Sequence, residues 1–304
     1  MKDSYLLTSD SAKRIYGEVR ALPVVDYHCH LSPREIYEDK QFDNIGAMWL
    51  GGDHYKWRLM RNVGIDECFI TGSAADEEKF TKYCTALEYA AGNPLYHWSH
   101  MELSMYFGID LPICEENAKI IWDAANAAIE KENLSPRKLI KRSGVEVICT
   151  TDDICDDLSW HDRIASDNTF ETRVIPSFRI DNLLLARRAG YAEYVAKLGE
   201  VSGIEIHGLE TLKRAVETRL GVFCAHGCRF ADVGIQYFPE RIASDEEAEE
   251  TFLRLITGEK VTDGEYLGFV GNLYLYINGL YKNNNIISQW HIAVVRNTNT
   301  LLYN

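Results

Sequence analysis

The sequence predicts an α/β fold in which helices cover a parallel β-sheet. Short runs rich in β-branched residues recur along the chain, and longer stretches with apolar residues at helical spacing lie between them. Strands that alternate with helices are typical of parallel β/α architecture. The chain has 304 residues, of which 46% are apolar and 26% charged, so it is long enough to bury a large core.

The predicted strands begin near the N-terminus with LPVVDYHCH. We expect strands at residues 22–30, 145–152, 172–178, 228–235 and 286–295, of which 228–235 has the weakest signal. The intervening segment 34–140 is too long for a single crossover and has helical periodicity with several aromatic clusters. It is expected to form a helical subdomain inserted after the first strand. The predicted parts are a lead-in with the first strand at 1–33, the inserted subdomain at 34–140 and further β/α units at 141–304.

Helix boundaries have recognisable signals. Ser135 is placed to cap a helix, Pro136 suits its first position, and Gly144 ends it just before a predicted strand. A Ser or Thr followed three residues later by Glu predicts capping boxes at residues 244–247 and 262–265. Further helices are expected at 76–91, 116–132, 182–199 and 208–225, and the Tyr and Leu stripe at 266–281 is expected in the core.

Composition argues against several classes of protein. The net charge is −14 and no stretch concentrates basic residues, so nucleic acid is not an expected partner. No apolar run reaches the length of a membrane span and no signal peptide is evident, so we expect a cytoplasmic protein without membrane association. The cysteines are scattered like small apolar residues. Cys224 and Cys228 lack a second pair, which favours a core or helix-end role over a zinc knuckle.

The motif VVDYHCHLSP places two histidines at the end of the first predicted strand. Side chains alternate along a strand, so His28 and His30 would lie on one face and could reach one metal ion. Histidines at this spacing also occur by chance on surfaces. The apolar run before them favours a metal site, because the carboxyl end of a strand in a β/α barrel opens into the active-site mouth.

Other polar residues have alternative interpretations. His54 in GGDHYKWR fits a helix cap or an aromatic cluster as well as an active site. Asp152 and Asp153 end a predicted buried strand, where they would serve catalysis or cap the following turn. The histidines assigned to packing, or to no chemistry, are His97, His100, His161, His207 and His226.

Longer motifs resemble a known family. The resemblance is carried, in order, by DYHCHLSPREIYEDKQFDNIGAMWLGGDHYKWRLMRNVGI, TGSAADEEKF, GNPLYHWSHMEL, VICTTDDICDDLSWH, VIPSFRID and QWHIAVVRNTNT, from about residue 10 to residue 304. These segments are similar to the uronate isomerases, also called glucuronate isomerases. The resemblance implies an amidohydrolase-like (β/α)8 TIM-like barrel. It also implies reversible aldose–ketose isomerisation of D-glucuronate to D-fructuronate and of D-galacturonate to D-tagaturonate.

The resemblance implies which residues would bind metal and move protons. His28 and His30 would be metal ligands, and His54 and Tyr55 would be active-site groups, with Tyr55 as proton donor or acceptor. A divalent cation on neutral imidazoles polarises carbonyl and hydroxyl oxygens, which suits an enediolate. Zinc is the first choice, and manganese, iron and cobalt are alternatives because ligand type alone does not decide the metal.

The resemblance also implies how a hexuronate substrate would be held. Arg179 in PSFRID would bind the substrate carboxylate, a task that suits the planar fork of a guanidinium. His291, near the end of the last predicted strand, and Arg296, just beyond it, are further candidates for contacting the substrate.

The sequence departs from the family pattern in two ways, which leave functions other than an active isomerase open. Five strands are predicted where the family's barrel has eight, and the aspartate that completes the family's metal site has no recognised counterpart. We therefore expect a barrel truncated after about five strands, whose open edges favour association with another copy or chain. The alternatives to an isomerase are a metal-dependent hydrolase of the amidohydrolase class and an inactive truncated fragment. The motifs GDHYKWR and PSFRID together favour the isomerase over the hydrolase.

Overall fold

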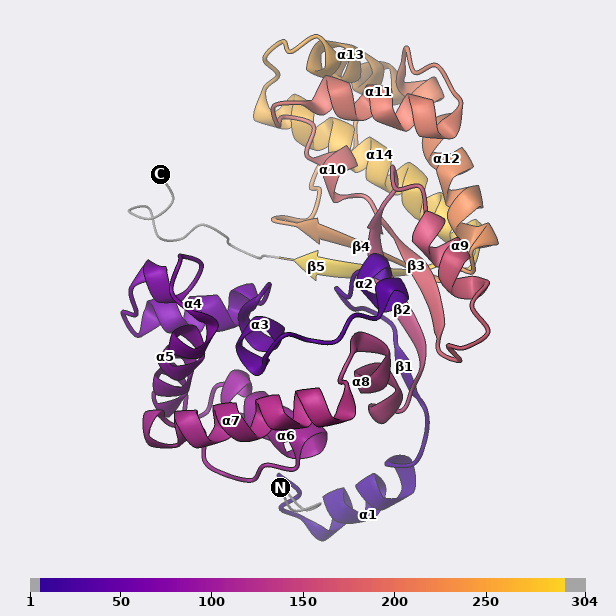
Figure 1. Cartoon of the computed structure of the whole chain (residues 1–304). Helices are drawn as coiled ribbons and strands as arrows, with labels where there is room; N and C mark the ends of the chain where they lie inside the picture. Colours follow the sequence, from indigo (N-terminus) through magenta and orange to yellow (C-terminus); the bar gives the residue numbers. More distant parts are fainter. Residues whose placement is uncertain (1–5, 293–304) are drawn as a thin grey trace. The chain divides into compact units, whose positions relative to one another are not determined.

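A computed structural model describes residues 6–292 of the chain (Figure 1). These residues form two compact units. The first comprises residues 6–24 and 38–145, and the second comprises residues 25–37 and 146–292. Each unit has a buried hydrophobic core of its own.

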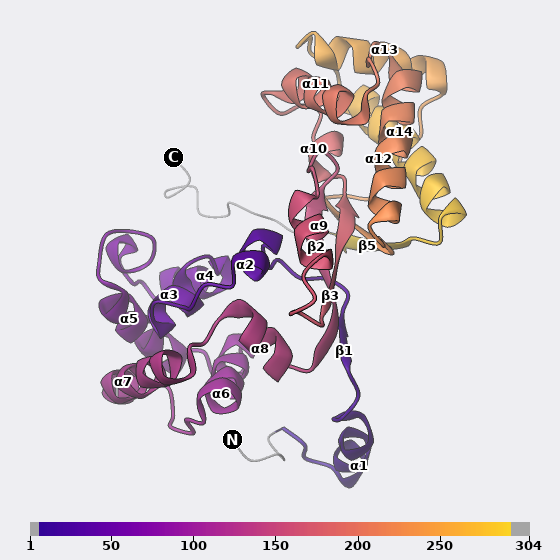
Figure 2. The ribbon, with the colours of Figure 1, turned by 45° about the vertical axis from the view of Figure 1, so that its right-hand side comes forward.

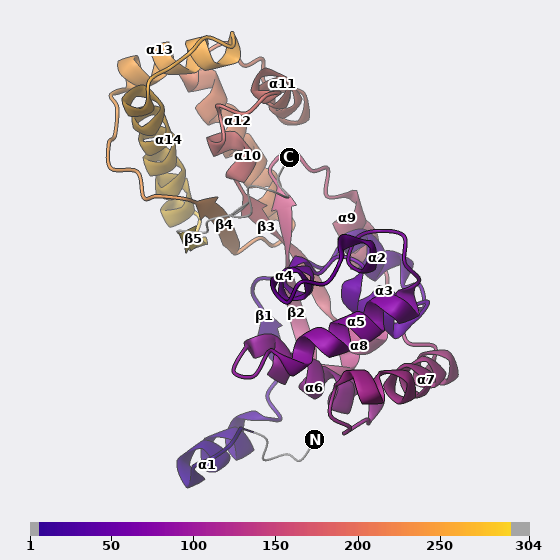
Figure 3. The ribbon, with the colours of Figure 1, turned by 90° about the vertical axis from the view of Figure 1, so that its left-hand side faces the viewer.

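The first unit is built from helices. Its core is centred on α5, which contacts α3, α4 and α7 and contributes the fully buried Phe80, Tyr83 and Leu87 (Figure 3). The helices of this unit are α1 (Asp10–Val19), α3 (Ile45–Leu50), α4 (His54–Asn62), the 3-10 helix η1 (Glu67–Phe69), α5 (Asp76–Glu88), α6 (Pro94–Phe107), α7 (Glu115–Glu132) and α8 (Pro136–Arg142). Between β1 and β2 the described residues form helices and their connections, as the periodicity predicts.

The second unit contains a five-stranded sheet with the order β1-β2-β3-β4-β5, in which β2 to β5 pair in parallel. The strands are β1 (Val24–Asp26), β2 (Val145–Asp153), β3 (Arg173–Arg179), β4 (Phe230–Ile235) and β5 (Ile287–Ile292). The sheet is curled, because Gln289 Nε2 of one edge strand donates a hydrogen bond of 3.0 Å to the carbonyl oxygen of Tyr27, just after the other edge strand. The predicted parallel α/β class is confirmed.

Helices of the second unit cover one face of the sheet. Phe178 of β3 packs against Phe223 of α12 and Tyr281 of α14, at ring-centroid distances of 5.0 and 6.2 Å. Figure 2 shows α11 to α14 gathered as one helical group. The helices of this unit are α2 (Pro33–Glu38), α9 (Ser159–Ala165), α10 (Asp181–Leu184), α11 (Tyr191–Ser202), α12 (Leu209–Ala225), α13 (Asp245–Ile256) and α14 (Asp263–Asn283). No helix among the described residues is long and apolar enough to cross a membrane.

The first predicted strand is longer than the observed one. It was expected over residues 22–30, whereas β1 ends at Asp26, so His28 and His30 follow the strand instead of lying on it. The backbone still runs beside β2, because the N–H of Cys29 donates to the carbonyl oxygen of Cys149 at 3.1 Å. The strand predicted at 286–295 is observed at Ile287–Ile292. Residues 293–295 of the prediction lie outside the described range.

Two helix predictions also need correction. The single helix expected at 182–199 is two helices, α10 and α11, because Gly190 takes a left-handed φ of +84° immediately before α11. Ser135 lies at the N-cap position of α8, but its buried Oγ makes no cap hydrogen bond. Pro136 at the first helical turn therefore defines that helix start without side-chain capping.

Candidate metal centre and active site

Three side chains of the second unit converge at the carboxyl ends of its strands. Nitrogen atoms of His28 and His291 and a carboxylate oxygen of Asp232 all lie within 4.8 Å of one another. His28 follows β1, whereas Asp232 lies in β4 and His291 in β5. In the parallel register Asp232 pairs with Gln289 and Gly234 with His291, so both functional side chains lie on the same face of the sheet.

The polar atoms of this cluster lack hydrogen bonds within the described structure. His28 Nδ1, His291 Nε2 and both carboxylate oxygens of Asp232 are buried without a hydrogen bond of good geometry, although Asp232 Oδ2 forms an ion pair with Arg179 Nη1 at 3.1 Å. Buried polar atoms are normally satisfied, so a cluster of such atoms is typical of a ligand-binding site. Imidazole nitrogens and a carboxylate oxygen suit zinc and also manganese, iron or cobalt. The residues present therefore fit a divalent cation.

Burial tunes the protonation of these side chains. Burial lowers the pKa of His28, and the neighbouring His291 and Arg179 lower it further. Neutral imidazole is the form that binds a metal. Burial raises the pKa of Asp232, although the adjacent Arg179 guanidinium opposes this shift. A cation bound here would favour the ionised carboxylate in the same way.

Arg179, the predicted carboxylate-binding residue, lies beside the cluster at the end of β3. Its Nη1 is 3.1 Å from Asp232 Oδ2, and its Nε and Nη2 donate to the two carboxylate oxygens of Asp181 at 2.8 and 3.3 Å. Burial lowers the pKa of Arg179, but the hydrogen bond to Asp181 and the charge of Asp232 raise it above its usual value. Asp181 is itself held by the backbone N–H of Gly234, at 3.1 Å. The guanidinium is thus positioned by two carboxylates.

His30, the second ligand expected from the His-x-His motif, lies next to the cluster. Its ring is 5.0 Å from that of His28 and edge-on to it, and burial and the neighbouring His28 lower its pKa. The third member of the converging group is Asp232, so metal ligation by His30 stays a prediction. Asp232 was missed in the sequence. The signal that could have revealed it is an acidic residue in the middle of the apolar strand FADVGI, where its side chain is fully buried.

His54 and Tyr55, the predicted catalytic pair, lie in the first unit at the start of α4. The helix is capped by Asp53, whose Oδ1 accepts hydrogen bonds from the N–H groups of Tyr55 and Lys56 at 2.9 and 3.2 Å. The rings of His54 and Tyr55 are 4.3 Å apart and both side chains are exposed. Their catalytic roles stay predictions, and Arg296 lies outside the described residues.

The residues at the end of β2 have structural partners. Asp153 caps the following turn, because its Oδ1 accepts a hydrogen bond of 2.9 Å from the N–H of Cys155. Asp152 accepts a hydrogen bond of 2.7 Å from the hydroxyl of Thr150, and the same hydroxyl is 2.8 Å from Nε2 of His161. Burial raises the pKa of Asp152 to about 7 and lowers that of His161 to about 4. His161, for which the sequence indicated no supporting neighbours, is therefore part of a buried polar chain.

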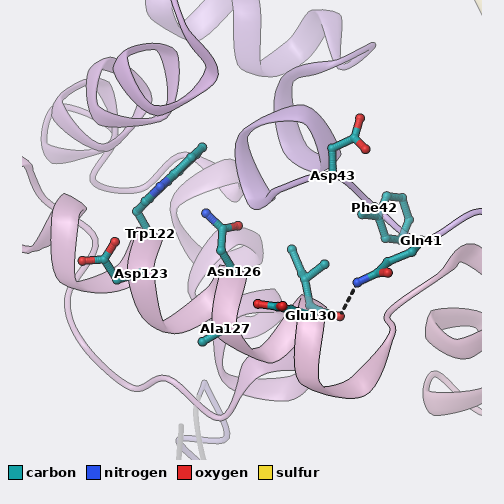
Figure 4. A pocket seen from close by; sticks show the side chains of 9 residues that line it. Gln41, Phe42, Asp43, Trp122, Asp123, Asn126, Ala127 and Glu130 are labelled. Atoms are coloured by element: carbon teal, nitrogen blue, oxygen red, sulfur yellow. Dashed lines mark hydrogen bonds between the residues drawn. The ribbon is translucent and has the colours of Figure 1, made fainter.

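The first unit has a cavity of about 560 Å³ between α7 and the segment before α3 (Figure 4). Its polar side chains hold the two walls together. Gln41 Nε2 donates to the carbonyl oxygen of Ile129 at 3.0 Å, and Asn126 Oδ1 accepts from the N–H of Ile45 at 2.9 Å. These groups are used in packing the segment against α7, and we assign no chemistry to the cavity.

Comparison with known proteins identifies the family. A family model described as glucuronate isomerase matches residues 1–304. The chain belongs to the glucuronate isomerase family. It is 41% identical to the uronate isomerase of Endomicrobium trichonymphae over 98% of this chain and 64% of that protein. It is 39% identical to the uronate isomerase of Lachnospira eligens over 100% of this chain and 65% of that protein.

Solved structures agree with this family assignment. The uronate isomerase of Thermotoga maritima is 30% identical to this chain, and the two structures superpose with a TM-score of 0.93. The match covers all of this chain and 66% of the Thermotoga protein. The glucuronate isomerase of Caulobacter crescentus, at 22% identity, shares the fold with a TM-score of 0.88. The curled parallel sheet matches part of the TIM-like barrel of the family. The chain spans slightly less than two thirds of the length of the relatives above.

Proposed function

We propose that this protein is a uronate isomerase that interconverts D-glucuronate and D-fructuronate, and D-galacturonate and D-tagaturonate. The observation that carries the proposal is the convergence of His28, Asp232 and His291 at the carboxyl ends of the strands, in a chain that belongs to the glucuronate isomerase family. In β/α barrels this end of the sheet is where chemistry takes place.

A divalent cation is the proposed cofactor, with zinc as first choice and manganese, iron or cobalt as alternatives. His28, Asp232 and His291 would hold it, with His30 as the adjacent donor. When bound, such a cation polarises the carbonyl and hydroxyl oxygens of an aldose or ketose. The set of buried atoms without hydrogen bonds supports this assignment.

The remaining proposed roles belong to residues of this chain. Arg179 would bind the hexuronate carboxylate, because a guanidinium presents several N–H donors in one plane and this one lies beside the cluster. Isomerisation moves a proton between C1 and C2, and Tyr55 and His54 are the proposed groups for donating and accepting protons. Arg296 is proposed to contact the substrate, whereas His291, for which the resemblance implied such a contact, is proposed to hold the cation.

The first experiment runs the purified chain on a sizing column with light scattering. The eluted peak is then assayed for D-glucuronate isomerisation with added zinc or manganese. Isomerisation that depends on added metal supports the proposal, and the scattering mass tests the proposed association of copies. A folded peak that binds metal but isomerises neither uronate would contradict it. The metal-dependent hydrolase is disfavoured by the family match, and its activity would appear as hydrolysis without isomerisation.

Arg179 provides a second test that separates substrate binding from metal binding. Arg179→Ala removes the guanidinium and is expected to raise KM for the uronate by tenfold or more, on the order of 1.5–3 kcal/mol of charge-assisted hydrogen bonding, while bound metal changes little. Arg214→Ala, which removes an exposed arginine of α12, is the matched control. Equal loss of metal and substrate affinity would show that Arg179 acts through Asp232 and not on the substrate.

A further inference from the structure

The second unit contains a cavity of about 870 Å³ that lies away from the metal cluster. Its walls come from α9, the segment that follows it, the start of β3 and the loop after α12. Arg173, the first residue of β3, lines it, whereas Arg179 at the last position of the same strand contacts Asp232. Its volume is within the range of small-molecule binding sites.

One wall of the cavity holds a buried imidazole nitrogen without a partner. His161 is 4% exposed and lines the cavity, and its Nδ1 makes no hydrogen bond in the described structure. When Asp152 is ionised, the Thr150 hydroxyl donates its single proton to that carboxylate and accepts from Nε2–H of His161. Nδ1 then carries a lone pair that the surrounding atoms cover, and it would accept a hydrogen bond from a ligand hydroxyl that displaces them.

Two arginines line the other part of the cavity. Both side chains are exposed, and neither guanidinium forms an ion pair with a carboxylate in the described part of the chain. Arg229 Nη1 donates to the carbonyl oxygen of Cys228 at 2.7 Å, which leaves its other N–H groups available. Arg173 packs over Gly227, since a Cβ at that glycine would lie 2.6 Å from Nη2. Gly227 also has a φ of +88°, so two constraints favour glycine here.

The acidic residues of the cavity are largely engaged elsewhere. Asp162 is 3.0 Å from Nε2 of His226, and Asp167 accepts hydrogen bonds from the N–H and hydroxyl of Thr169 at 2.9 and 2.6 Å. Glu171 is exposed and is the remaining carboxylate of the lining. The groups free to meet a ligand are thus two guanidinium forks, one carboxylate and one imidazole acceptor.

We propose that this cavity is a second binding site, distinct from the metal centre, for a small hydroxylated anion such as a sugar acid or a sugar phosphate. The carboxylate or phosphate binds Arg173 and Arg229, which match the geometry of such anions. A ligand hydroxyl donates to Nδ1 of His161. The site lies at the amino-terminal end of β3, so binding there is independent of substrate binding at Arg179.

Isothermal titration calorimetry of the purified chain tests the proposal with D-glucose 6-phosphate, D-gluconate and methyl phosphate. We expect at least one of the two hydroxylated anions to bind with Kd on the order of 1 mM or tighter. Whichever binds identifies the anionic group as phosphate or carboxylate. Methyl phosphate lacks the carbon-bound hydroxyls and is expected to bind about tenfold more weakly than D-glucose 6-phosphate. A shift of the His161 Nδ1 resonance in ¹⁵N NMR on binding is the second readout.

Variants distinguish this site from the active site. Arg173→Ala with Arg229→Ala is expected to weaken binding at least tenfold, whereas Arg214→Ala on α12 and Arg179→Ala leave Kd unchanged. If the double alanine variant unfolds, the double lysine variant keeps both charges and is expected to bind with intermediate affinity. Failure of both hydroxylated anions to bind, or binding that Arg179→Ala abolishes and the double variant retains, would overturn the proposal.

Discussion

At the scale of single residues, the chemistry of this protein is concentrated in buried polar atoms. His28, Asp232 and His291 present atoms that are buried without hydrogen bonds, whereas Asp152 and His161 share the hydroxyl of Thr150. Leaving a buried polar group unsatisfied costs about 1–3 kcal/mol. The first group therefore favours a ligand, and the second is satisfied mainly from within the chain.

Removal of the buried carboxylate should abolish tight metal binding. Asp232→Asn replaces the anionic donor with a neutral amide of the same shape, so we expect the Kd for zinc to rise at least tenfold. Competition with a chromophoric chelator measures the change. The control is Asp263→Asn, because Asp263 is exposed and its ion pair in the described structure is a surface pair with Arg187. Unchanged zinc affinity in Asp232→Asn would remove Asp232 from the metal site.

The Asp152–Thr150–His161 chain should produce two opposing pH dependences of stability. The pKa of Asp152 is raised from 3.8 to about 7, so its contribution to stability is full below 3.8 and is lost as pH rises through 7. The pKa of His161 is lowered from 6.5 to about 4, so its contribution is full above 6.5 and is lost as pH falls through 4. The two effects largely cancel between about pH 4 and 6.5.

Single substitutions should expose each effect. Relative to the wild-type protein, we expect Asp152→Asn to gain stability as pH rises from about 4 to 6.5, and His161→Gln to lose it. Each change is on the order of 3 kcal/mol, from shifts of two to three pKa units at about 1.4 kcal/mol each. Urea unfolding at the two pH values measures the free energies. Parallel pH profiles for wild type and both variants would show that these groups titrate normally.

At the scale of elements, close backbone approach is needed where β4 meets the loop after β3. A Cβ on Gly234 would lie 2.7 Å from Asp181 Oδ1, the carboxylate that holds Arg179. Gly234→Ala is therefore expected to displace Asp181 and to lower the free energy of unfolding by about 1–3 kcal/mol. Gly221→Ala in α12 is the control, since no atom lies within 4 Å of its Cβ position. That substitution should stabilise the helix by up to about 1 kcal/mol, and equal stability of the two variants in urea would contradict the steric argument.

Elements with local signals were predictable from the sequence. The capping box at the start of α13 is confirmed, with Ser244 and Glu247 each accepting the backbone N–H of the other at 3.2 and 3.0 Å. The strands β2 to β4 fall within two residues of their predicted positions. The break before Gly190 and the early end of β1 could not be predicted, because helical periodicity continues across the break and the apolar run VVDYHCH continues past the strand.

At the scale of the whole molecule, the candidate site depends on the curl of the sheet. The sequence predicts that strands alternate with helices, which implies a parallel sheet, but it contains no local signal for which strand ends meet. His28 and His291 lie near opposite ends of the described chain, one just after the edge strand β1 and the other in the edge strand β5, yet their ring centroids are 4.7 Å apart. Asp232 acquires its role only through this long-range arrangement, which explains why the motif His-x-His was recognised and Asp232 was not.

A metal ion that joins both edges of the sheet should stabilise the second unit as a body. Metal that binds only the folded unit raises the free energy of unfolding that unit by RT ln(1 + [L]/Kd), where [L] is the free metal concentration. This is about 2.7 kcal/mol when that concentration is a hundred times Kd. Hydrogen exchange with mass spectrometry should therefore show slower exchange of β4 and β5 when zinc is added. The matched internal reference is α5 and α7, whose core belongs to the first unit. In Asp232→Asn, zinc should no longer slow the hydrogen exchange of β4 and β5, and the exchange rates of α5 and α7 should be the same as in the wild-type protein. Protection that rises equally in both units, or that persists in Asp232→Asn, would place the metal elsewhere in the chain.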